Sequence, residues 1–205
     1  MKIAFFVMLL QLFSSVYADS LKLSFLKTDF TDTQTDAINS VQGAALEYYH
    51  VVGNGHGGSN ESAIISTLSY SKDDTLEVLH PKIRWIETKK MKDYDVALFT
   101  SFAYRTWRKD TVKNNLAYFE AYKFSYADFG IQAVFHEKDW HLGFELGYQR
   151  AINFSEPNTH GTKIVVPLRY DINKNTSIEL AYEDEKWNLN QLKSKTTKLG
   201  IIIKW

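Results

Sequence analysis

The strongest constraint in this sequence is a regular alternation of apolar and polar residues at its carboxyl end. Within residues 196–205, one set of alternate positions is apolar and ends in an aromatic ring, and the other is mostly small or charged. The apolar set is Leu199, Ile201, Ile203 and Trp205, and the other set includes Lys198, Gly200 and Lys204. Because successive side chains of a β-strand point to opposite faces, the pattern predicts a two-faced terminal strand. Such a strand suits a membrane β-barrel, in which the last strand pairs with the first.

The segments before this strand carry the same alternation. Residues 140–149, 163–172 and 177–183 each place large apolar groups on one face and polar, charged or small groups on the other. A soluble β-sandwich shows a similar pattern, because its polar face meets water. Strand lengths near ten residues and aromatic residues at the strand ends favour the barrel. We therefore predict an all-β fold, a closed antiparallel transmembrane β-barrel.

The terminal strand also resembles a known signal. Its apolar residues, counted back at alternate positions from Trp205, resemble the C-terminal assembly signal of bacterial outer-membrane β-barrel proteins. That signal usually ends in Phe and often has an aromatic residue where this chain has Ile203. The resemblance implies a Gram-negative cell outer membrane. It also implies four kinds of partner: outer-membrane lipids, lipopolysaccharide, the barrel assembly machinery and periplasmic chaperones.

The amino-terminal end predicts export. Lys2 precedes an apolar run over residues 3–10, and Val16 and Ala18 are the residues that a signal peptidase would read. The apolar run is about half of the roughly 20 residues that a membrane-spanning helix needs. We expect a signal peptide over residues 1–18 and a β-barrel domain over residues 19–205.

Composition excludes several classes of function. The chain has no cysteine, which excludes disulfides, thiol nucleophiles and Cys-ligated metal sites. Its formal net charge is zero, so nothing electrostatic favours nucleic acid. Aromatic residues make up 15% of the chain, as expected for a barrel with two interfacial aromatic girdles.

The number of strands depends on one change of phase. The apolar positions are even-numbered over residues 116–126 and odd-numbered from Phe129. Because a period of two cannot slip without a bulge or a turn, we expect one of these at Ala127–Asp128. A turn gives eleven strands and a bulge gives ten, and single-chain bacterial barrels normally have an even number. We favour about ten, with eight or twelve as alternatives; ten also results if the turn is real and residues 21–28 stay outside the barrel.

The inward face is where chemistry or permeation would occur. If the apolar side chains face lipid, the polar face points into the lumen, and pairs such as Arg169 with Glu179 are expected across neighbouring strands. The candidate lumen residues are His136, His141, Glu145, Lys163, Arg169, Glu179, Glu183, Lys198 and Lys204. They fit either an internal salt-bridge network or a narrow polar channel.

Three functional hypotheses follow. The first is a small passive, porin-like channel or a structural barrel with a charged lumen. The second is a lipid-modifying acyl hydrolase or acyltransferase, for which Ser155, Glu156 and His160 share one loop. The third is a soluble periplasmic sandwich or ligand-binding barrel. We assign no catalytic residue, cofactor or metal, although His136, His141 and Glu145 would point the same way.

Overall fold

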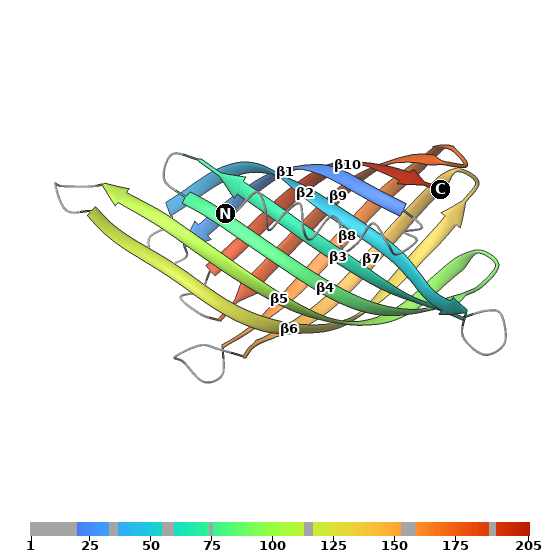
Figure 1. Cartoon of the computed structure of the whole chain (residues 1–205), viewed down its shortest axis with the longest axis horizontal. Helices are drawn as coiled ribbons and strands as arrows, with labels where there is room; N and C mark the ends of the chain where they lie inside the picture. Colours follow the sequence, from blue (N-terminus) through green and yellow to red (C-terminus); the bar gives the residue numbers. More distant parts are fainter. Residues whose placement is uncertain are drawn as a thin grey trace.

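The computed structural model describes residues 20–32, 37–54, 60–73, 76–112, 117–152, 159–188 and 192–205. They form a closed antiparallel barrel of ten strands, in which each strand pairs with the next and β1 pairs with β10 (Figure 1). The predicted fold class is therefore confirmed. The strands are β1 (Ser20–Asp32), β2 (Ala37–Asn54), β3 (Asn60–Lys72), β4 (Leu76–Lys90), β5 (Tyr94–Val112), β6 (Ala117–Glu137), β7 (Trp140–Ala151), β8 (His160–Asn173), β9 (Thr176–Trp187) and β10 (Leu192–Lys204).

The terminal strand closes the barrel. β10 pairs with β1 without interruption from Leu21 opposite Ile203 to Asp32 opposite Leu192. The arrangement that leaves residues 21–28 outside the barrel is therefore wrong, because they form most of β1. The predicted signal peptide, residues 1–18, lies outside the described residues.

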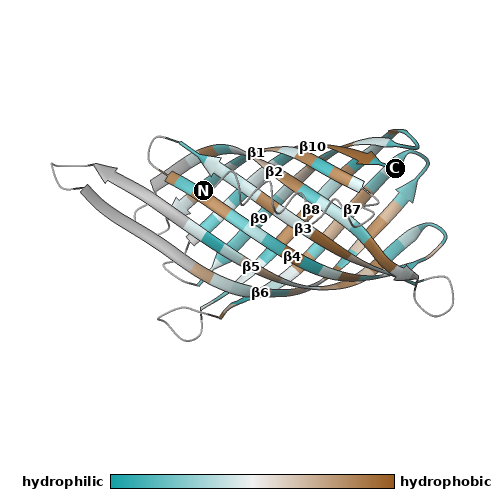
Figure 2. Cartoon of the chain, viewed as in Figure 1, coloured by the Kyte–Doolittle hydropathy of each residue, from teal (hydrophilic) through white to brown (hydrophobic). Residues whose placement is uncertain are grey.

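The outer surface of the barrel is apolar. Hydrophobic and hydrophilic residues alternate along the strands, as the brown and teal bands in Figure 2 show. The outward residues include Leu23, Phe25, Ile83, Leu98, Phe102, Phe129, Ile131, Phe135, Leu142, Phe144, Leu180, Leu199, Ile201, Ile203 and Trp205. So large an apolar surface is unfavourable in water and suits lipid. No helix in the described part of the chain could span a bilayer.

The phase change in β6 has a different cause from the one predicted. β6 pairs with β5 and β7 through Ala127 and Asp128 with no shift of register, so neither a turn nor a bulge occurs there. Instead, Phe124 and Tyr126 face the interior and pack edge-on against Trp187. The strand keeps one phase, and its inward face changes from aromatic to polar.

The two ends of the barrel differ. At the end that holds Ser20 and Trp205, here called the terminal end, short turns at residues 138–139 and 174–175 join neighbouring strands. Backbone N–H groups of Asp171 and Lys204 donate to carbonyls of Asp139 and Asn175, so each turn is tied to an adjacent strand. At the opposite end, here called the far end, the β5–β6 hairpin extends beyond the other strands (Figure 1).

A pair of arginine substitutions tests the orientation of the sheet. Phe144 points outward from β7, whereas Gln132 of β6 lines a polar cavity in the interior. We expect Phe144→Arg to cost about 2–4 kcal/mol of stability, because an Arg then faces the bilayer, and Gln132→Arg to cost much less. Urea unfolding in lipid vesicles measures both. Equal losses would contradict the assigned orientation.

Candidate functional site

A four-residue ion cluster fills the middle of the barrel. Arg84 of β4 donates two hydrogen bonds to Glu145 of β7, at 2.7 and 2.9 Å. Lys163 of β8 lies 3.0 Å from Glu145 and 2.6 Å from Asp128 of β6. All four side chains are buried. β4 and β7 are separated in the sheet by β5 and β6, so the Arg84–Glu145 pair reaches across the interior.

The alternation of side chains along the strands and one glycine of β7 position the residues of this central cluster. Arg84 lies between the exposed residues Ile83 and Trp85, so its own side chain must point inward. Asp128 approaches β7 at Gly147, where a Cβ atom would lie 2.7 Å from a carboxylate oxygen of Asp128. A glycine at this position therefore leaves the space that the carboxylate occupies. Phe99 packs beneath the guanidinium of Arg84, 4.1 Å from its ring centre.

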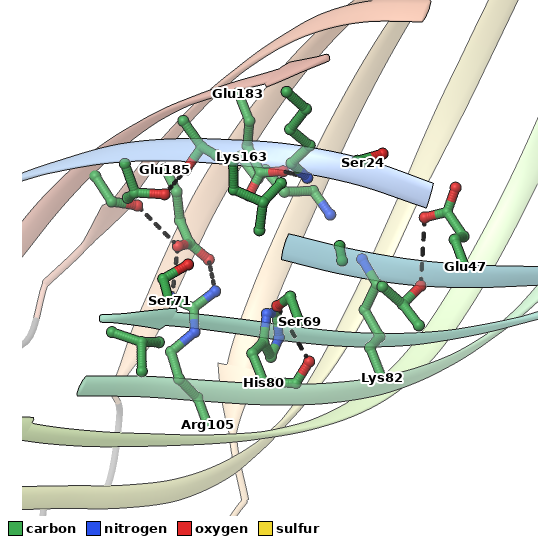
Figure 3. Close-up of a pocket in the computed structure, with 18 of the residues that line it drawn as sticks. Ser24, Glu47, Ser69, Ser71, His80, Lys82, Arg105, Lys163, Glu183 and Glu185 are labelled. Atoms are coloured by element: carbon green, nitrogen blue, oxygen red, sulfur yellow. Dashed lines mark hydrogen bonds and ion pairs between the residues drawn. The ribbon is translucent and has the colours of Figure 1, made fainter. Parts of the chain in front are cut away.

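A second pair reaches across the barrel nearer the far end. Arg105 of β5 donates hydrogen bonds of 2.6 and 3.2 Å to Glu185 of β9 (Figure 3). Glu185 also accepts hydrogen bonds from Gln149 and Ser194, so its charge is well compensated. The adjoining wall is aromatic, because Tyr126 packs beside Arg105. Two bidentate Arg–Glu pairs therefore connect opposite parts of the wall.

The β1–β2 and β9–β10 walls carry pairs between nearer neighbours. Lys22 of β1 contacts Glu179 of β9 and lies 3.2 Å from Glu47 of β2. Lys198 of β10 lies 2.6 Å from Glu183 of β9. These pairs follow the wall and do not cross the barrel.

Two adjoining cavities lie between the cross-barrel pairs and this wall. One has a volume of about 90 Å³ and extends toward the far end, and the other has a volume of about 150 Å³. Figure 3 shows the first, with charged side chains directed into it from several strands. The residues that line both are Lys22, Glu47, Thr67, Lys82, Lys163, Glu183 and Lys198.

A separate cluster lies inside the terminal end. The Nδ1 atoms of His136 and His141 are 2.7 Å apart. The outer nitrogen of each ring faces a carboxylate: Nε2 of His136 lies 3.0 Å from Asp95, and Nε2 of His141 lies 3.1 Å from Asp171. This arrangement fits two N–H groups directed at the carboxylates and one proton held between the rings. The two carboxylates and the two rings therefore form a hydrogen-bonded chain that joins β5 to β8.

The predicted lumen residues divide between these groups. Glu145, Lys163, Glu179, Glu183 and Lys198 line the cavities. His136, His141, Arg169 and Lys204 lie at the terminal end, where Asp171 contacts the last three.

The predicted Arg169–Glu179 pair is replaced by other partners. The two residues are directly opposite in register, but Glu179 contacts Lys22, and Arg169 lies 3.4 Å from Asp171.

Several interior residues were not predicted from the sequence. They are Lys22, Glu47, Lys82, Arg84, Arg105, Asp128 and Glu185. Lys82 and Arg84 had a usable signal, since they alternate with apolar residues along β4. Asp128 was obscured because it falls at the apparent change of phase.

The structure describes only one of the three residues considered for acyl transfer, and the three considered for a metal have other contacts. Ser155 and Glu156 lie outside the described residues. The ring of His160 lies 3.1 Å from the amide of Asn188. Glu145 binds Arg84, whereas His136 and His141 contact each other. The described residues contain no group of three His, Asp or Glu arranged to hold a metal ion.

Comparison with known proteins identifies the fold. No family model and no curated protein sequence matches this chain. The β domain of the Bordetella autotransporter BrkA is 8% identical; the alignment covers 91% of this chain and 100% of that one, with a TM-score of 0.56. The NanC porin is 10% identical, with 89% and 100% covered and a TM-score of 0.51.

The central cluster generates a test of pairing. We expect Glu145→Leu alone to cost about 3–5 kcal/mol, because it leaves Arg84 buried without its main partner. The double variant Arg84→Met/Glu145→Leu should cost less, since neither charge then remains. Urea unfolding of the wild type, both single variants and the double variant completes the cycle. Strictly additive losses would show that the two side chains do not interact.

Taken with the apolar exterior and the ten-strand closure, the likeness to solved structures shows that this chain has the fold of the bacterial outer-membrane β-barrels.

Proposed function

We propose that this protein is a porin-like outer-membrane barrel that passes water and small ions along a narrow polar path. The observation that carries the proposal is the adjoining pair of cavities, which share seven lining residues along one side of the interior. Arg84 and Arg105 reach across the interior to their glutamate partners, and all four side chains line the cavities. The path therefore suits ions and water better than sugars or larger solutes.

The charged lining supports permeation by polar species. Five of the predicted lumen residues line the two cavities, and ion pairs hold their side chains in position along the wall. Pores select ions through rings of charged side chains, so an interior of mixed charge with small cavities fits a low-conductance pore. The same ion pairs also stabilise the barrel, so the interior serves both the channel role and the structural role.

Membrane placement follows the same proposal. With both chain ends on the periplasmic side, as in other single-chain barrels, the terminal end faces the periplasm and the β5–β6 hairpin faces outward. Outer-membrane lipids and lipopolysaccharide then contact the exterior. Residues 1–18 serve for export, periplasmic chaperones carry the unfolded chain, and Leu199, Ile201, Ile203 and Trp205 present the apolar face of β10 to the assembly machinery.

Single-channel recording tests the proposal. The refolded protein in a planar bilayer should give small, steady unitary steps. The double variant Arg84→Ala/Glu145→Ala should give steps several times larger, because it removes the central cross-barrel pair. Glu87→Ala is the control, since its side chain is exposed and accepts hydrogen bonds from Ser62 and Trp85.

Two results would contradict the proposed function. A wild-type protein that folds and inserts but gives no unitary steps has a closed interior. Equal conductance in the wild type and the double variant would show that the Arg84–Glu145 pair does not limit the path.

A further inference from the structure

Lys82 occupies a special position in the barrel. It projects inward from β4, where it lies opposite Thr67 of β3 and Ala103 of β5. Its side chain lines both cavities, and Figure 3 shows it directed into the interior between the strands that carry Glu47 and Arg105. Lys82 is therefore one of the seven residues at the junction of the two cavities.

Lys82 also differs from its charged neighbours in its contacts. The other cations around the cavities each have a carboxylate partner; the pairs are Lys22 with Glu47 and Glu179, Arg84 with Glu145, Arg105 with Glu185, Lys163 with Asp128 and Glu145, and Lys198 with Glu183. Within the described part of the chain, no carboxylate lies at ion-pair distance from Lys82.

Most of the charged residues at the junction of the two cavities already have partners. The residues shared by the two cavities comprise four lysines, two glutamates and one threonine. Glu47 accepts a hydrogen bond from Thr67 and pairs with Lys22, and Glu183 pairs with Lys198. Lys163 contacts Asp128 and Glu145, so Lys82 is the shared lysine that no carboxylate contacts in the described part of the chain. An unpaired charge in a partly buried site favours a ligand of opposite sign.

We propose that Lys82 forms a binding site for a small monovalent anion, such as chloride, at the junction of the two cavities. The bound anion supplies the partner that the chain itself does not provide. This proposal rests on the proposed function in one respect, since it makes Lys82 the residue that gives the path its preference for anions.

Reversal potentials in a potassium chloride gradient test the selectivity. The wild type should favour chloride, and Lys82→Gln should lower the chloride-to-potassium permeability ratio by about fivefold, as expected from losing a unit charge beside the ion. Lys82→Arg should keep the preference. Lys195→Gln, an exposed lysine of β10, is the control. Lys198→Gln removes an equal charge from an ion pair, so we expect it to lower the permeability ratio less than Lys82→Gln does. The assignment would be overturned if the two variants lowered the ratio equally. It would also be overturned if Lys82→Gln left the ratio unchanged.

A measurement of chloride binding that does not depend on conduction tests this site independently of the proposed function. Chloride-35 NMR of the refolded protein in detergent should show excess line width for the wild type and Lys82→Arg, and its loss for Lys82→Gln. Lys82→Met provides a second variant should Lys82→Gln fail to refold. Equal line widths would overturn the site even if the bilayer conducts. Excess width that depends on Lys82 would support the site even in a barrel that does not conduct.

Discussion

The interior of this barrel depends on one electrostatic constraint: charges removed from water must find partners of opposite sign. A ten-stranded barrel is narrow, so side chains that point inward from one wall reach those of another. Arg84 meets Glu145 from a strand three positions away in the sheet, and Arg105 meets Glu185 from a strand four positions away. Because breaking one buried pair leaves a charge uncompensated, each pair ties opposite parts of the wall together.

Packing supports these pairs at both ends of the interior. Toward the far end, Phe30 and Val78 belong to a buried apolar group, and both also line the smaller cavity. Toward the terminal end, Phe99 packs with Ile86 and stacks on Arg84. Apolar constrictions next to charged cavities limit hydration. Charge and packing together leave the two polar cavities on one side of the interior.

The fold followed from the sequence because alternation is a local property. The faces of β7 to β10 could be predicted from the period of two alone, and the terminal strand indicated closure. β6 was harder, because Phe124 and Tyr126 are large and apolar yet face the interior, where Trp187 packs against them. A local pattern assigns such residues to lipid, since it contains no information about a partner that lies far along the chain.

The site was predictable as a face but not as a set of contacts. Glu145 and Lys163 were expected to point inward, but their partners Arg84 and Asp128 lie on strands that the pattern cannot position across the barrel. Arg169 shows that the register of the strands does not decide which side chains pair. Register placed it opposite Glu179, yet its contact is with Asp171, because side-chain reach and competition from Lys22 decide the pairing.

The size limit of the path tests most directly whether the cross-barrel pairs fill the interior. Liposomes that contain the refolded protein can be placed in isotonic solutions of potassium chloride or of small sugars, and their swelling followed by light scattering. We expect ion-dependent swelling and none with arabinose or sucrose. Rapid swelling with either sugar would mean that Arg84, Arg105 and their partners leave an open pore, which would contradict the central claim.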